Sequence, residues 1–132
     1  MSILKKIIIK ESKGKSNNIA GLFNFVREIN ASYQKSLSET FDKYQKVHKK
    51  LEQLEIELSK DYKLSKLDYD FQLINDEDNN NFKEIQLEID FVFENDNIDE
   101  NKIDKLCQTL FGKFFTNGVL SKNKYNLYLV IK

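Results

Sequence analysis

The longest pattern in the sequence is helical. From Ile19 to about Ser59, apolar residues recur every three or four positions, as they do along one face of an α-helix. At 1.5 Å per residue, such a helix is about 60 Å long, which is about twice the diameter of a domain of this size. The pattern therefore predicts one very long first helix that overhangs the domain over about residues 38–60, or that bends.

A kink in this helix is expected between Ala31 and Ser38, where Ser36 and Glu39 have the spacing of a capping box. After the kink, the apolar positions follow a 3,4,3,4 seam flanked by Lys and Glu, which is coiled-coil spacing over two heptads. The seam consists of Tyr44, Val47, Leu51, Leu54 and Leu58. Exposed apolar stripes on a protein surface favour association. We therefore predict that the seam binds a protein partner, and a second copy of the chain, in a homodimer, is one such partner.

Four other segments have the composition or the alternation of β-strands. Ile3–Lys10 is apolar on both faces, which is typical of a central strand. Leu67–Ile74 and Glu84–Glu94 alternate between apolar and polar residues and are joined by a polar loop, so they indicate a β-hairpin with one solvated face. Tyr125–Ile131 is predicted as the last strand. The inward-facing hairpin residues are expected to be Leu67, Tyr69, Phe71, Leu73, Ile85, Leu87, Ile89, Phe91 and Phe93.

A second amphipathic helix is predicted at Ile98–Thr116, begun by Asn97 and Glu100 as an N-cap pair and ended by Asn117–Gly118. The element order is then β-α-β-β-α-β, which resembles the ferredoxin-like, split-βαβ arrangement. This resemblance covers the whole chain but rests on element order alone. It implies an α+β fold with a four-stranded antiparallel sheet in the order 4-1-3-2, both helices on one face, and the other face open. Since unrelated functions share this fold, it implies no activity.

Composition is that of an ordinary globular protein. The 132 residues are 40% hydrophobic and 32% charged, the usual size and balance of a single domain over 1–132. One cysteine, Cys107, rules out a disulfide framework, and no apolar run reaches membrane-spanning length. We therefore expect a cytoplasmic protein without a membrane partner.

Charge is divided between the two halves of the chain, although the net charge is zero. Residues 1–66 carry 14 Lys/Arg and 8 Asp/Glu, whereas residues 67–132 carry 7 Lys/Arg and 13 Asp/Glu. A chain with two charge signs can associate with itself or offer opposite faces to different partners.

Catalytic and cofactor motifs are all incomplete. Gly14-Lys15-Ser16 lies between a strand and a helix, as a phosphate loop does, but the position five residues before Gly14 is Ile9. The polar loop after Asp76 lacks the Gly and Glu positions of a calcium loop. His48, the only histidine, is expected on the surface or beside the seam, and Cys107 on an apolar stripe. We predict no catalytic residue, no cofactor and no metal, and hence a protein that is not an enzyme.

Four carboxylates are expected on the predicted open face of the sheet: Asp68, Asp70, Glu88 and Asp90. In a purely structural interpretation they are solvated, and Lys6 and Lys10 of the first strand pair across to Glu88 and Asp90. In the functional interpretation they dock a basic partner. We predict a non-enzymatic protein–protein interaction module, an adaptor or inhibitor, that binds through the seam, the acidic face or both. One form is an inhibitor whose acidic face mimics nucleic acid.

Two alternatives stay open. Lys43, Lys46, Lys49 and Lys50, together with the Lys5–Lys15 region, would suit a nucleic-acid-binding protein with steep salt dependence. The four carboxylates would suit a divalent metal in an enzyme. Palm domains of polymerases and cyclases share the ferredoxin-like fold and do this chemistry, but their first strand carries an acid where Ile3–Lys10 has only lysines.

Overall fold

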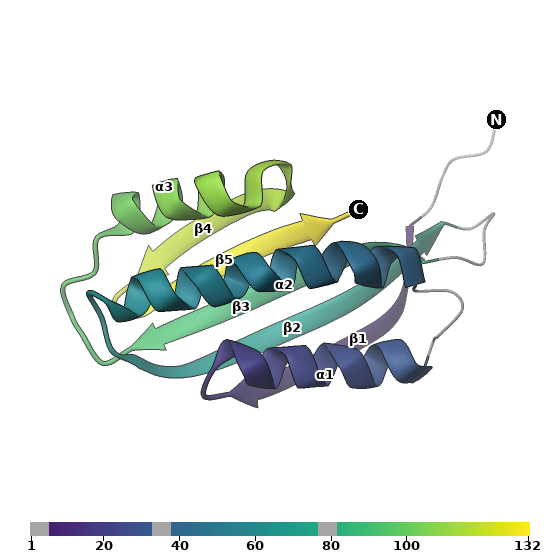
Figure 1. The fold of residues 1–132 in the computed structure, drawn as a ribbon, viewed down its shortest axis with the longest axis horizontal. Helices are drawn as coiled ribbons and strands as arrows, with labels where there is room; N and C mark the ends of the chain where they lie inside the picture. The colour runs from purple at the N-terminus through teal and green to yellow at the C-terminus, as the bar shows by residue number, and fades with distance from the viewer. Residues whose placement is uncertain (1–5, 33–37, 77–81) are drawn as a thin grey trace.

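The computed structural model describes residues 6–32, 38–76 and 82–132. Its elements, in chain order, are β1 (Lys6–Ser16), α1 (Ile19–Ser32), α2 (Ser38–Ser59), β2 (Leu64–Asp76), β3 (Phe82–Phe93), α3 (Glu100–Phe111), the 3-10 turn η1 (Gly112–Phe114), β4 (Phe115–Ser121) and β5 (Lys124–Ile131). The five strands form one antiparallel sheet in the order β1-β2-β3-β5-β4. The three helices lie on the same face of that sheet (Figure 1). The α+β class is confirmed, whereas the four-stranded order 4-1-3-2 is wrong.

The division of the predicted long helix into α1 and α2 accounts for this topology. The two helices run in opposite directions beside each other (Figure 1). A single helix would return the chain parallel to the strand it left, but a pair of helices reverses the direction once more. As a result β2 runs antiparallel beside β1, and β1 lies at the edge of the sheet rather than at its centre. The break falls where it was predicted, between Ala31 and Ser38, although Ser36 of the proposed capping box lies outside the described residues.

α2 lies along the sheet and does not overhang it (Figure 1). Its seam residues belong to the hydrophobic core and none is more than 6% exposed. These residues are Tyr44, Val47, Leu51, Leu54 and Leu58. The predicted overhanging seam is therefore wrong, because a helix that packs on a sheet needs the same 3,4 spacing as a coiled coil. Because the seam residues are buried in the core, they are not available to bind a partner.

Alternation in the hairpin predicted its two faces correctly, except that the side chain of Leu73 lies outside the described part of the structure. Every second residue of β3 from Ile85 to Phe93 is buried beneath the helices, and so are the inward residues of β2 from Leu67 to Phe71. β5 adds Tyr125, Leu127, Leu129 and Ile131 to the same layer. The polar residues between these positions consequently lie on the opposite face, away from the three helices.

α3 is shorter than predicted, and a strand follows it. Its N-cap is Asp99 rather than Asn97, and its C-cap is Gly112 at a φ of 53°, a conformation that suits glycine. β4 then begins at Phe115, inside the segment predicted as helical. Phe111 and Phe114 keep the spacing of a helix face, so periodicity alone extended the helix and missed the strand.

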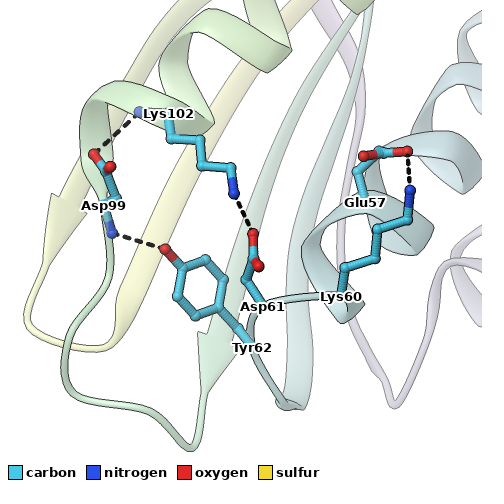
Figure 2. A network of polar contacts seen from close by, with 6 residues as sticks. All are labelled: Glu57, Lys60, Asp61, Tyr62, Asp99 and Lys102. Atoms are coloured by element: carbon cyan, nitrogen blue, oxygen red, sulfur yellow. Dashed lines mark hydrogen bonds and ion pairs between the residues drawn. The ribbon is translucent and has the colours of Figure 1, made fainter.

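Polar contacts with the end of α2 explain where α3 begins (Figure 2). The Asp99 carboxylate accepts a hydrogen bond from the Lys102 N–H at 3.2 Å, and the Asp99 N–H donates to the Tyr62 hydroxyl at 3.0 Å. The Lys102 ammonium also donates to the Asp61 carboxylate. Tyr62 is 37 residues away in the chain, and this distant contact favours Asp99 over Asn97 as the cap.

Candidate functional site

The face of the sheet away from the helices brings together the four predicted carboxylates. The strand register places Asp68 of β2 opposite Asp90 of β3, and Asp70 opposite Glu88. Residues directly opposite in an antiparallel pair have Cβ atoms about 4.5–5.5 Å apart, and like charges there destabilise the sheet. The site is thus two neighbouring rows, each with two carboxylates, which we call the acidic rows.

Among the side chains that the structure describes, one amide and one lysine contact the acidic rows. The Asn126 amide of β5 donates to Asp90 at 2.7 Å. Lys66 Nζ lies 3.7 Å from the Asp68 carboxylate, and within the described parts of the chain this is the one ion pair to the four acids. Since both groups of that pair are a third or more exposed, solvent screens their attraction.

The predicted pairing of Lys6 and Lys10 with Glu88 and Asp90 is wrong. β1 lies beside β2 and not beside β3, and its register places Lys6 opposite Asp76 and Lys10 opposite Leu73. The β1 residues in register with the acidic rows are instead Lys13, opposite Asp70, and Lys15, opposite Asp68. The error follows from the sheet order, which alternation within one strand does not specify.

The acidic rows line a hollow of about 410 Å³, bounded on the β1 side by Gly14 and Lys15. Asp68 Oδ1 and Asp70 Oδ1 are buried at this site and accept no hydrogen bond within the described structure. A buried acceptor without a donor costs about 1–3 kcal/mol. The Asp68 side chain as a whole is still 34% exposed, so a cation that enters the hollow would find two carboxylate oxygens without a donor.

Two further hollows continue from the acidic rows along the strands. The nearer, about 270 Å³, is lined by Asp70, Gln72, Gln86, Glu88 and Tyr128. The farther, about 490 Å³, shares Gln86 and is lined also by Glu84, Lys113, Phe114, Thr116, Val130 and Lys132. Because adjacent hollows share wall residues, they follow one another along the sheet. We call this row of hollows the sheet trough; the acidic rows line one end, and Lys113, Lys132 and Glu84 line the other.

The lysines proposed to bind nucleic acid lie away from the acidic rows, and the carboxylates proposed to bind a metal ion are not arranged to do so. Lys43, Lys46, Lys49 and Lys50 are exposed on α2, which lies on the opposite face of the sheet from the acidic rows (Figure 1). Lys5 lies outside the described residues. Among the residues that are described, no group of three or more His, Cys, Asp or Glu side chains is arranged to hold a metal ion. No helix in the described segments is long and apolar enough to cross a membrane.

Cys107 occupies the apolar stripe of α3, as predicted, and is buried. Burial raises the pKa of its thiol to about 12. A cysteine nucleophile reacts as the thiolate, so this environment holds Cys107 in its unreactive form.

His48 lies beside the seam, which was one of its two predicted positions, and it is buried rather than on the surface. Its ring stacks on Phe23 of α1 with centroids 4.4 Å apart, and its Nδ1 lies 3.4 Å from the Tyr44 hydroxyl. Its Nε2 lies 3.3 Å from a carboxylate oxygen of Glu52, which is exposed. Burial lowers the pKa of His48 below its usual 6.5, and the Glu52 charge opposes this shift as the smaller effect.

We expect the protein to lose stability as the pH falls below about 6.5, the usual pKa of histidine. Because the folded-state pKa of His48 is lowered, the unfolded chain binds this proton more readily than the folded protein does. The stability that neutral His48 contributes is therefore present above pH 6.5 and is lost as the pH falls through its folded-state pKa. Thermal unfolding between pH 7.5 and pH 5.5 measures it. Since His48 is the only histidine, a His48→Gln variant should have a flatter profile; an equally steep profile in that variant would assign the effect to other groups.

Comparisons with protein-family models, with curated proteins and with solved structures gave no match to this chain. The chemistry of the site therefore rests on its own geometry.

Proposed function

We propose that the chain is a non-enzymatic protein-binding module, an adaptor or inhibitor, whose acidic rows dock a positively charged segment of a partner protein. The observation that carries the proposal is the placing of Asp68 opposite Asp90 and Asp70 opposite Glu88 in one hollow. Like charges directly opposite destabilise a sheet, and the β1 lysines in register, Lys15 and Lys13, stand opposite only one acid of each row.

The buried oxygens add to this reasoning. Asp68 Oδ1 and Asp70 Oδ1 have no donor in the described structure, and features that cost stability without a local return are characteristic of functional sites. The hollow is open to solvent along the sheet, and Glu88 on its wall is exposed. A partner's Arg or Lys side chains would supply both the missing donors and the opposite charge.

The test is a double variant that is expected to raise the stability of the fold and to weaken the binding. In Asp70→Asn/Glu88→Gln, the amides can donate to each other or to the remaining carboxylates, and one like-charge pair disappears. We expect the unfolding free energy to rise by about 0.2–1 kcal/mol, seen as a midpoint higher by about 1–4 °C. Affinity for a capped peptide of alternating Arg and Ser, measured by titration calorimetry at low salt, should fall about tenfold or more.

A matched control separates docking from general attraction between opposite charges. Asp42→Asn/Asp96→Asn removes the same net charge from two exposed positions away from the acidic rows. It should retain the affinity of the parent protein for the Arg-Ser peptide. Equal weakening in both double variants, or unchanged binding in Asp70→Asn/Glu88→Gln, would contradict the proposal.

A further inference from the structure

Four exposed lysines follow one another along α2, on the face of the molecule away from the acidic rows. They are Lys43, Lys46, Lys49 and Lys50, and we call them the lysine ridge. Lys43, Lys46 and Lys50 recur at intervals of three and four residues, so they stack along one side of the helix. Lys49 comes three residues after Lys46 and is its neighbour on the helix surface. At 1.5 Å per residue, the ridge is about 10 Å long.

The lysine ridge is not paired with acids within the described part of the chain. No ion pair between described residues includes any of its lysines, whereas Lys60 at the end of the same helix pairs with Glu57 at 2.9 Å. Residues 42–50 hold the four lysines and one acid, Asp42, which gives this segment a net charge of 4 − 1 = +3 with His48 neutral. The ridge therefore presents positive charge to solvent.

The acids that follow on α2 are directed toward α1 instead. Glu55 accepts a hydrogen bond from the Ile19 N–H at 2.9 Å, and Glu52 lies 3.3 Å from His48 Nε2. Because the His48 ring stacks on Phe23 of α1, these contacts mark the side of α2 that faces α1. At 3.6 residues per turn, the three stacked lysines of the ridge lie on the opposite side of the helix.

A duplex of nucleic acid matches this row of charges. Each strand of a duplex presents one phosphate per about 3.4 Å of helix axis, so the ridge spans about three phosphates of one strand. Lysine binds phosphate as a point charge. Contacts to the phosphate backbone fix the position of a protein on a duplex but carry no information about base sequence.

Two other polyanions fit this surface less well. A helix that lies in a membrane surface buries its apolar face in lipid, but the apolar seam of α2 is part of the core. Proteins that bind single strands stack the bases on aromatic side chains. The exposed large hydrophobic residues of the described chain are Ile56 and Val119, and neither is aromatic.

We propose that the lysine ridge binds the phosphate backbone of a nucleic-acid duplex without reading its base sequence. This goes beyond the proposed function, because it concerns the opposite face of the molecule and a second partner. The acidic rows lie behind the core, and charges are screened over about 10 Å at 0.1 M salt. A net charge of zero therefore does not prevent this contact.

The experiment measures binding of the full chain to a short fluorescent DNA duplex by anisotropy. With three phosphate contacts, the affinity should fall about 40-fold between about 50 and 200 mM salt, a slope of about −3 in logarithmic coordinates. In Lys43→Gln/Lys46→Gln/Lys50→Gln the slope should move toward zero by about 1 for each lysine, and the affinity at the lowest salt concentration should fall about tenfold or more. Arginine at the same three positions keeps the charge and should retain the binding.

A matched control removes three positive charges elsewhere. Lys105→Gln/Lys122→Gln/Lys124→Gln changes exposed lysines of α3 and of the turn from β4 to β5, and it should keep the slope of the parent protein. Equal weakening in both triple glutamine variants, unchanged binding in the first, or no binding at the lowest salt concentration would overturn the proposal. Tighter binding to a single strand of the same length, or to vesicles of phosphatidylserine and phosphatidylcholine, would overturn the choice of a duplex. Since none of these variants changes the acidic rows, the result is independent of the Arg-Ser peptide experiment.

Discussion

Replacing Leu51 by alanine is expected to cost about 2–5 kcal/mol of unfolding free energy, as for other fully buried leucines. Leu51 is 0% exposed and lies in the core between α2 and the sheet. Typical domains have only about 5–15 kcal/mol in total, so this one change would remove a large part of the stability. Urea unfolding followed by circular dichroism measures it, as a lower midpoint at an unchanged slope.

Ile56→Ala is the matched control for this experiment. Ile56 lies on the same helix but is 62% exposed, so its truncation should change the unfolding free energy by about 0.5 kcal/mol or less. If α2 instead overhung the domain, Leu51→Ala would resemble Ile56→Ala. A small effect at Leu51 would therefore refute the packing of α2 on the sheet.

Local patterns predicted the parts of the fold that local chemistry determines. The strict alternation in β2 and β3 identified the buried residues because one face of each strand must be apolar. The same alternation placed Asp68, Asp70, Glu88 and Asp90 on the outer face. The first helix begins at a polar cap, as helices commonly do, and the side chain of Asn18 accepts a hydrogen bond from the Gly21 N–H at 3.1 Å.

The order of strands depends on contacts between distant segments, and sequence patterns do not contain it. A break near Ser36 was predicted, but whether the chain bends slightly or reverses there depends on how α1 and α2 share the sheet. The reversal moves β1 to the edge and replaces Lys6 and Lys10 by Lys13 and Lys15 as neighbours of the acids. The sheet trough was missed for the same reason, since Lys113 of η1 and Lys132 after β5 line one hollow with Glu84 only because of the order of the strands.

A second large effect on stability is expected for substitution of Gly118 of β4, which lies against the Tyr125 side chain. Tyr125 is fully buried, and its hydroxyl donates to the Asp104 carboxylate of α3 at 2.6 Å. Burial, and after it this hydrogen bond, raises the pKa of the Tyr125 phenol far above its usual value. A Cβ on Gly118 would lie 1.9 Å from the Tyr125 hydroxyl and 3.0 Å from a carboxylate oxygen of Asp104. Gly118 is thus the space through which the tyrosine reaches α3.

Gly118→Ala should therefore destabilise the protein by about 1–3 kcal/mol, the usual cost of overpacking. The backbone itself does not require glycine, because Gly112 is the only glycine with a positive φ in the described chain. Without the tyrosine, alanine in a strand would stabilise by about 0.5–1 kcal/mol, so the sign of the measured change decides whether the clash exists. Val119→Ala, at a neighbouring position that is 48% exposed, is the control and should change little.

A double-mutant cycle identifies the Tyr125 hydroxyl as the cause. Tyr125→Phe alone removes the hydrogen bond to Asp104 and should lower the unfolding free energy by about 1–2 kcal/mol. In the Tyr125→Phe background, Gly118→Ala should cost clearly less than in the parent, because the atom nearest to the new Cβ is gone and the ring is no longer held by Asp104. Contacting residues give such non-additive energies, whereas independent sites add to within about 0.5 kcal/mol. Additive costs would mean that Gly118 serves the backbone of β4 and not the tyrosine, and that the link from β5 to α3 does not depend on this gap.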